Sequence, residues 1–252
     1  MAPFSRENLP EEEVFIRPTK GKRDPEISGD ALMVLVRSEL DRILASGKVS
    51  SVERWDMFHF NLYRIEYQER APLIVFGPFT GAPQAVMGLE KVVALGARRI
   101  WVMGWCGSLQ PDLRIGDLML PTRGLSEEGT SLHYPIGDNS PAPCLELVTR
   151  LEKLLHSRGY SYRKGGIWST DAPFRETKQK VEAYRRQGVL AVDMEMAALM
   201  TVAIYRQVDL CALLVVSDEL SGKDWNPGFS TSRFREASER VGVLMLEFLC
   251  QQ

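Results

Sequence analysis

Short apolar segments alternate with helical patterns along most of this chain, and this alternation limits the folds that it can adopt. Six apolar runs have the length of a strand, at 31–36, 72–77, 99–104, 116–121, 188–194 and 210–217. Apolar residues at helical spacing occupy 84–96, 143–159, 177–188, 195–207 and 232–249. Continuously apolar runs are typical of strands that are buried on both faces. We therefore expect an α/β fold in which a mostly parallel sheet is covered by helices on both faces.

The length of the chain fits one large domain. Its 252 residues, of which 44% are hydrophobic, can bury a full core. The first 30 or so residues are rich in Pro, Lys, Glu and Gly, so we expect an N-terminal arm over 1–30 and a single domain over 31–252. Residues 1–13 lack the apolar stretch of a signal peptide, and no later run approaches the length of a membrane span.

Charge and cysteine content narrow the possible partners. The 31 basic and 33 acidic residues nearly cancel, which disfavours a nucleic acid polymer or an anionic membrane and favours a small molecule. The cysteines form no C-x-x-C pair, so we expect free thiols and a cytoplasmic protein; they are Cys106, Cys144, Cys211 and Cys250. His59, His133 and His156 lie far apart without ligand spacing, so we expect no metal site.

Three groups of residues follow predicted strands. Asp193 and Glu195 follow one run, Asp218 follows another, and the glycine-rich segment 104–107 follows a third. Because ligands bind at the carboxyl ends of the strands in open α/β sheets, these groups could converge on one pocket. The alternatives are structural: Asp193 and Glu195 could cap a helix, 104–107 could be a tight turn, and Asp218 could be a polar strand end.

Five motifs occur in a specific order along the chain. They are Gly104-Trp105-Cys106-Gly107 with Ile115-Gly116-Asp117, Glu127-Glu128-Gly129-Thr130-Ser131-Leu132-His133-Tyr134, Ser169-Thr170-Asp171-Ala172-Pro173-Phe174, Val192-Asp193-Met194-Glu195 and Val216-Ser217-Asp218. Over about residues 31–250 the chain resembles the nucleoside phosphorylase family, in its purine and uridine phosphorylase branch. The resemblance implies a three-layer α/β/α fold with a central mixed, partly barrel-like sheet.

The resemblance also implies a reaction, the cleavage of the N-glycosidic bond of a nucleoside, with purine or purine-like bases favoured and uridine possible. Asp218 would protonate N7 of the leaving base, and Glu195 would hold the ribose hydroxyls beside the Met194 backbone. Three residues would line the base pocket, namely Pro173, Phe174 and Cys106. Burial as ordinary core residues is the alternative for Phe174 and Cys106.

The phosphate-binding positions of the family are altered in this chain. Ser38 stands where the family has a Gly, whereas Arg42 appears at the expected Arg position. Val102 replaces an Arg, and Trp105 replaces a Ser or Thr that contacts phosphate. Phosphate is thus a possible co-substrate, with Arg37, Arg42 and Arg123 as candidate ligands, and no organic cofactor is expected.

Two other interpretations stay open. Glu39 lies near the position of an acid that activates water in related nucleosidases, so hydrolysis could replace phosphorolysis; the alternative for Glu39 is an ordinary, solvent-facing helix acid. The second is a catalytically weakened protein that binds a nucleoside, because Val102, Trp105 and Phe79 are apolar. In each case the resemblance implies a homo-oligomer, either a dimer or a hexamer.

Overall fold

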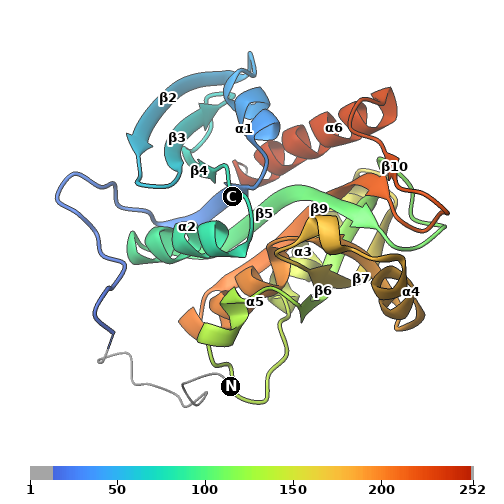
Figure 1. The fold of residues 1–252 in the computed structure, drawn as a ribbon. Coiled ribbons are helices and arrows are strands. Elements are labelled where there is room, and N and C mark those ends of the chain that lie inside the picture. The colour runs from blue at the N-terminus through green and yellow to red at the C-terminus, as the bar shows by residue number, and fades with distance from the viewer. Residues whose placement is uncertain (1–13, 251–252) are drawn as a thin grey trace.

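The computed structural model describes residues 14–250, and a long, strongly curved sheet forms its centre (Figure 1). The strands are β1 (Gly29–Val34), β2 (Val49–Asp56), β3 (Asn61–Tyr67), β4 (Leu73–Gly77), β5 (Ala97–Ser108), β6 (Leu118–Ser126), β7 (Tyr162–Ser169), β8 (Val189–Asp193), β9 (Asp209–Glu219) and β10 (Asn226–Pro227). The helices are α1 (Arg37–Leu44), α2 (Ala82–Ala94), α3 (Leu145–Ser157), α4 (Lys178–Arg186), α5 (Met196–Arg206) and α6 (Ser232–Leu249). Two short 3₁₀ helices, η2 (Thr130–His133) and η3 (Pro173–Arg175), lie in loops.

Half of the sheet closes into a barrel. The strand order is β10-β9-β6-β7-β8-β5-β1-β4-β3-β2, and β9 also pairs with β5, which closes the ring β5-β9-β6-β7-β8. Strand β5 runs parallel to β9 and β1 but antiparallel to β8, and β6 runs antiparallel to β9. The predicted mixed, partly barrel-like sheet is therefore confirmed, whereas the expectation of a mostly parallel sheet from the apolar runs alone is wrong.

Helices cover the sheet in two main layers. Helices α2 and α5 bury their apolar residues in one large cluster with one face of β1 and β5. Helices α1, α3 and α6 pack in a second cluster, which contains Trp101 and Met103 of β5. Helix α4 packs in a third, small cluster that contains Trp168 of β7 and Val189 of β8. The predicted three-layer α/β/α arrangement is confirmed (Figure 1).

The sequence patterns missed four strands, including the two-residue β10, and one helix. Strand β2 is exposed along most of its length and β7 contains two glycines among charged residues, so neither forms a continuous apolar run. Strand β3, the partner of β2 in the hairpin, and the short helix α1 were missed as well. The prediction that 104–107 forms a turn after a strand is wrong, since β5 continues through Ser108 with one irregularity after Cys106.

The described part of the N-terminal arm, residues 14–28, contains no helix or strand and passes the last turn of α2 on the way to β1. Lys91 of α2 holds it, because its Nζ donates to the Thr19 carbonyl and lies 2.5 Å from Asp24 Oδ2. The domain boundary at residue 31 stays a prediction. The expectation that residues 1–13 do not form a signal peptide also stays a prediction, because these residues lie outside the described part of the chain. Within residues 14–250, no helix has the length and apolar character that a membrane span requires.

Candidate active site

Strand β5 brings the two predicted acidic groups together. Gly107 pairs with Val192 of β8 on one side and with Asp218 of β9 on the other. The ends of β8 and β9 therefore flank the same two residues of β5, Gly107 and Ser108. Because the barrel closes through β5, acids that are distant in sequence converge although β8 runs antiparallel to its neighbour.

Asp193, the last residue of β8, is a structural acid. Its Oδ2 accepts hydrogen bonds from the backbone N–H of Met196 at 2.7 Å and of Glu195 at 3.2 Å, so it caps the first turn of α5. Its Oδ1 accepts from the Ser169 hydroxyl at 2.5 Å. Both carboxylate oxygens of Asp193 thus accept hydrogen bonds from protein groups. The capping alternative is correct for Asp193.

Glu195 lies at the N-cap of α5 but makes no side-chain capping bond. Its carboxylate instead reaches across to the loop before α2, where Oε1 accepts from the Gly81 N–H at 2.6 Å. Gly81 has φ of +80°, a conformation that favours glycine and turns this N–H toward the acid. The capping alternative is therefore wrong for Glu195, a residue that is 8% exposed and whose carboxylate contacts the backbone of Gly81.

Burial dominates the electrostatics of this pair. It raises the pKa of Glu195, which the neighbouring charge of Asp193 raises further, while the Gly81 and Met194 backbones act in the opposite direction. Burial also raises the pKa of Asp193, against the hydrogen bonds from Ser169 and Met196. An acid in such a position gains from a ligand that brings hydrogen-bond donors or positive charge.

Asp218 lies on the opposite side of Gly107 and is half-buried. Its Oδ1 accepts from the Ser217 hydroxyl at 2.6 Å, and its Oδ2 accepts from the indole Nε1 of Trp225 at 2.8 Å. A Cβ on Gly107 would lie 3.1 Å from Asp218 Oδ2, so a glycine is needed here for close approach rather than for an unusual φ. The sequence did not single out Trp225, which lies seven residues further on in a loop.

The predicted base-pocket residues behave differently from one another. Phe174 and Pro173 lie in η3 and are exposed, Phe174 fully, so the alternative of a buried Phe is wrong. Cys106 is buried, and burial together with the charges of Asp193 and Asp218 raises the pKa of its thiol.

The region after β1 contains the predicted anion-binding residues. The residue before α1, Val36, makes no side-chain capping bond, and Leu35 packs against Gly104 of β5. Ser38 is exposed, and Arg42 donates to Glu39 Oε2 at 2.7 Å. Glu39 is only 1% exposed and its Oε1 has no hydrogen-bond partner, so the alternative of a solvent-facing acid is wrong.

The three apolar replacements lie in packed surroundings. Val102 and Phe79 belong to the cluster beneath α2, where Phe79 packs against the rings of Phe60 and Phe76. Trp105 packs in the α6 cluster, on the other side of β5 from Cys106, and its Nε1 donates to the Ser238 hydroxyl at 3.3 Å. The indole therefore does not lie beside Glu195.

Two of the motifs support the site from the loops. The buried carboxylate of Glu128 accepts from the Ser126 and Ser131 hydroxyls, which holds the loop after β6. Gly129 N–H donates to Asp171 Oδ2 at 2.8 Å, which joins this loop to the loop after β7. Both loops end near β8, where Thr170 N–H donates to the Asp193 carbonyl.

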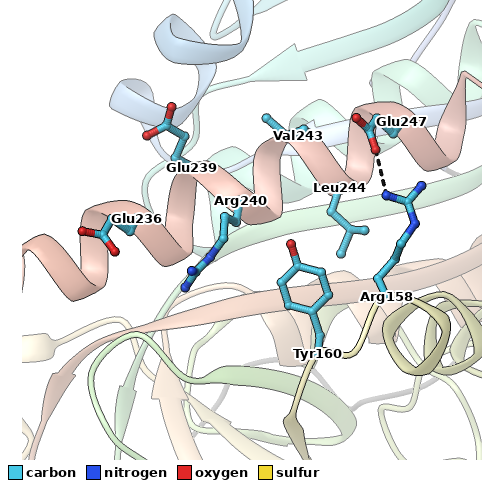
Figure 2. Close-up of a pocket in the computed structure, with 8 residues that line it drawn as sticks. All are labelled: Arg158, Tyr160, Glu236, Glu239, Arg240, Val243, Leu244 and Glu247. Carbon is cyan, nitrogen blue, oxygen red and sulfur yellow. Dashed lines mark hydrogen bonds and ion pairs between the residues drawn. The ribbon is translucent and has the colours of Figure 1, made fainter.

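Two surface cavities are lined by neither Glu195 nor Asp218. A cavity of about 460 Å³ lies between α6 and residues 158–160 and is lined by both acidic and basic side chains, including the ion pair of Arg158 and Glu247 (Figure 2). A groove of about 620 Å³ separates α4 from residues 220–224. Among residues 14–250, no group of three or more His, Cys, Asp or Glu side chains is arranged to hold a metal ion.

The sequence profile of the Phosphorylase superfamily matches residues 31–249, and the chain belongs to this family. The chain is 28% identical over 140 residues to a guanosine phosphorylase of Halorubrum lacusprofundi, a match that covers 56% of this chain and 58% of that protein. It is 26% identical over 148 residues to a DeoD-type purine nucleoside phosphorylase of Clostridium novyi, covering 58% and 64%. Each match thus spans less than two thirds of the relative.

Solved structures share the fold. A purine nucleoside phosphorylase of Toxoplasma gondii superposes with a TM-score of 0.79 at 18% identity, over 97% of this chain and 98% of that one. A uridine phosphorylase of Vibrio fischeri ES114 superposes with a TM-score of 0.76 at 19% identity, over 88% and 92%. The resemblance that the five motifs indicated is confirmed at the level of family and fold.

Proposed function

We propose that this protein is a nucleoside phosphorylase that cleaves the N-glycosidic bond of purine nucleosides with phosphate as co-substrate. The observation that supports the proposal is that the end of β8, which leads into Asp193 and Glu195, and the end of β9, which carries Asp218, pair with opposite sides of Gly107 of β5. The names of the relatives, a guanosine phosphorylase and a purine nucleoside phosphorylase, favour a purine over uridine.

The two acids suit the two charges of the reaction. Glycosidic cleavage passes through a ribose with oxocarbenium character, while negative charge develops on the leaving base. Glu195 would accept hydrogen bonds from the ribose hydroxyls, with the Met194 backbone beside it, and its carboxylate would favour the positive sugar. Asp218 would donate a proton to N7 of the base. Pro173, Phe174 and Cys106 would border the base.

We place phosphate at the start of α1, near Ser38, where backbone N–H groups and the helix dipole favour an anion. Arg42 is available there only if it gives up part of its bond to Glu39. A hydrolytic reaction is the second candidate, because the buried, half-unpaired Glu39 could activate water instead. A homo-oligomer is the expected assembly, and the four free cysteines favour the cytoplasm.

The purified protein, incubated with a panel of nucleosides with and without phosphate, should release purine bases only when phosphate is present. Chromatography of the products would separate ribose 1-phosphate from ribose. Release of free ribose at an equal rate without phosphate would show that the protein hydrolyses the nucleoside and is not a phosphorylase. Tight binding without turnover of any nucleoside would instead support a binding protein.

Trp225→Phe should lower kcat/KM for purine nucleosides by about 3- to 10-fold, the effect of losing one hydrogen bond of about 0.5–1.5 kcal/mol. The indole orients the Asp218 carboxylate, so it is a positioning residue. The same substitution in an Asp218→Asn background should cause no further loss. An equal loss in both backgrounds would show that Trp225 acts elsewhere, and Trp55→Phe on β2 is the matched control.

A further inference from the structure

Gln84 lies in the first turn of α2, three residues after Gly81, and the proposed reaction gives it no role. Its side-chain amide connects two separate segments of backbone. Oε1 accepts from the Thr80 N–H at 2.7 Å, and Nε2 donates to the His59 carbonyl at 2.9 Å. Because a backbone N–H can only donate and a carbonyl can only accept, these two partners fix the orientation of the amide.

The His59 end of this bridge is a fixed point. His59 lies in the turn between β2 and β3, which the bond of the Met57 N–H to the Phe60 carbonyl closes at 2.9 Å. Phe60 is buried in the cluster beneath α2, where its ring packs against Phe79. The amide of Gln84 therefore connects the loop before α2 to a turn that the core already positions.

The Thr80 end of the bridge is the part that needs support. Thr80 is exposed, so its side chain adds little packing to hold the backbone there. The next peptide unit carries the N–H of Gly81, which donates to Glu195 Oε1 at 2.6 Å. Rotation about the backbone dihedrals of Thr80 would turn this N–H away from the acid. The bond to Gln84 restrains that rotation.

The hydrogen bond of Gln84 differs from the usual cap of a helix N-terminus. Gly81 is the N-cap of α2, so Gln84 is the third residue of the helix. A Glu or Gln at that position commonly accepts a hydrogen bond from the N–H of the N-cap residue itself. Here it accepts from the preceding residue, Thr80, which leaves the N–H of Gly81 for Glu195.

We propose, on the basis of the function argued above, that Gln84 is a positioning residue for ribose recognition. It orients the Gly81 N–H, which in turn holds the Glu195 carboxylate in one orientation for the ribose hydroxyls. Met194 adjoins the same loop, since a Cβ on Gly81 would lie 3.9 Å from its Cε. Both residues assigned to the ribose, Met194 and Glu195, thus meet the loop that Gln84 holds.

The test compares guanosine with 2′-deoxyguanosine in the wild type and in Gln84→Leu, which keeps the approximate size of the side chain but forms no hydrogen bond. We expect the ratio of kcat/KM for guanosine to that for 2′-deoxyguanosine to fall by about 3- to 10-fold, because the contact of Glu195 with the 2′-hydroxyl is weakened. This ratio does not depend on the fraction of folded enzyme. In a Glu195→Ala background the substitution should leave the ratio unchanged, because the acid through which Gln84 acts is absent.

A conservative variant tests the orientation directly. In Gln84→Glu the carboxylate keeps an acceptor for the Thr80 N–H and loses only the donor to His59. It should retain the wild-type ratio within about twofold. Gln179→Leu is the matched control, because Gln179 is exposed in the first turn of α4 and should not affect the ratio.

The outcomes separate this inference from the proposed function. A wild type that cleaves no nucleoside would refute the function itself, and an active wild type without a preference for guanosine over 2′-deoxyguanosine would refute the ribose role of Glu195 together with this inference. An active wild type that has the preference, with a Gln84→Leu variant that keeps it, would refute the positioning role alone. The same conclusion would follow if Gln84→Glu lost the preference as fully as Gln84→Leu, because the bond to Thr80 would then not matter.

Discussion

Asp218→Asn should lower kcat/KM for guanosine and inosine by about 100- to 10,000-fold, the usual contribution of a positioned general acid. The carboxyl group is half-buried at the end of β9 and is oriented by Ser217 and Trp225, so an amide of the same shape fits without repacking. What the amide lacks is a proton that it can transfer to N7 of the leaving base. Initial rates with excess phosphate would measure the effect.

A substrate that needs no proton provides the control for this prediction. The five-membered ring of 7-methylguanosine is already cationic, so its base can leave without protonation at N7. Asp218→Asn should therefore cleave 7-methylguanosine at nearly the wild-type rate while it fails on guanosine. If both substrates were affected equally, Asp218 would act in binding or in folding and not as the acid.

The fold could be predicted from the sequence wherever a segment is buried on both faces. Strand β4 is buried throughout and β9 is buried over 210–217, and both appear as continuous apolar runs. The β2–β3 hairpin extends the sheet at its edge, where β2 is largely exposed and has no apolar period. The relative direction of the strands could not be predicted from the sequence either. The antiparallel pairing of β8 with β5 depends on barrel closure and not on the composition of either strand.

The candidate site was predictable in its acids but not in their partners. The order of Asp193, Glu195 and Asp218 after apolar runs indicated a shared pocket, yet Asp193 and Glu195 look equivalent in sequence. The hydrogen-bond partners distinguish the two acids. Ser169 bonds to Asp193, the structural acid, and Gly81 bonds to Glu195, the acid proposed to bind ribose. These partners are 24 and 114 residues away, a distance over which local patterns carry no information.

Glu195→Ala should lower kcat/KM for ribonucleosides by about 100- to 10,000-fold, because two charge-assisted hydrogen bonds of about 1.5–3 kcal/mol each are lost. The Gly81 N–H would lose its acceptor as well, but that loop keeps a second anchor in the bond of Thr80 N–H to Gln84. The loss should be smaller for 2′-deoxyguanosine than for guanosine, since one of the two hydroxyls is already missing there.

The matched control is Asp193→Asn, two residues away in the same motif. Its amide oxygen can replace only part of the capping of Met196 and the bond from Ser169, so the variant should be destabilised by about 1–3 kcal/mol, with a lower melting temperature. It should nevertheless retain the wild-type preference for guanosine over 2′-deoxyguanosine. If Glu195→Ala kept that preference and Asp193→Asn lost it, the roles of the two acids would be exchanged, and the ribose would lie against β8 instead of beside the start of α5.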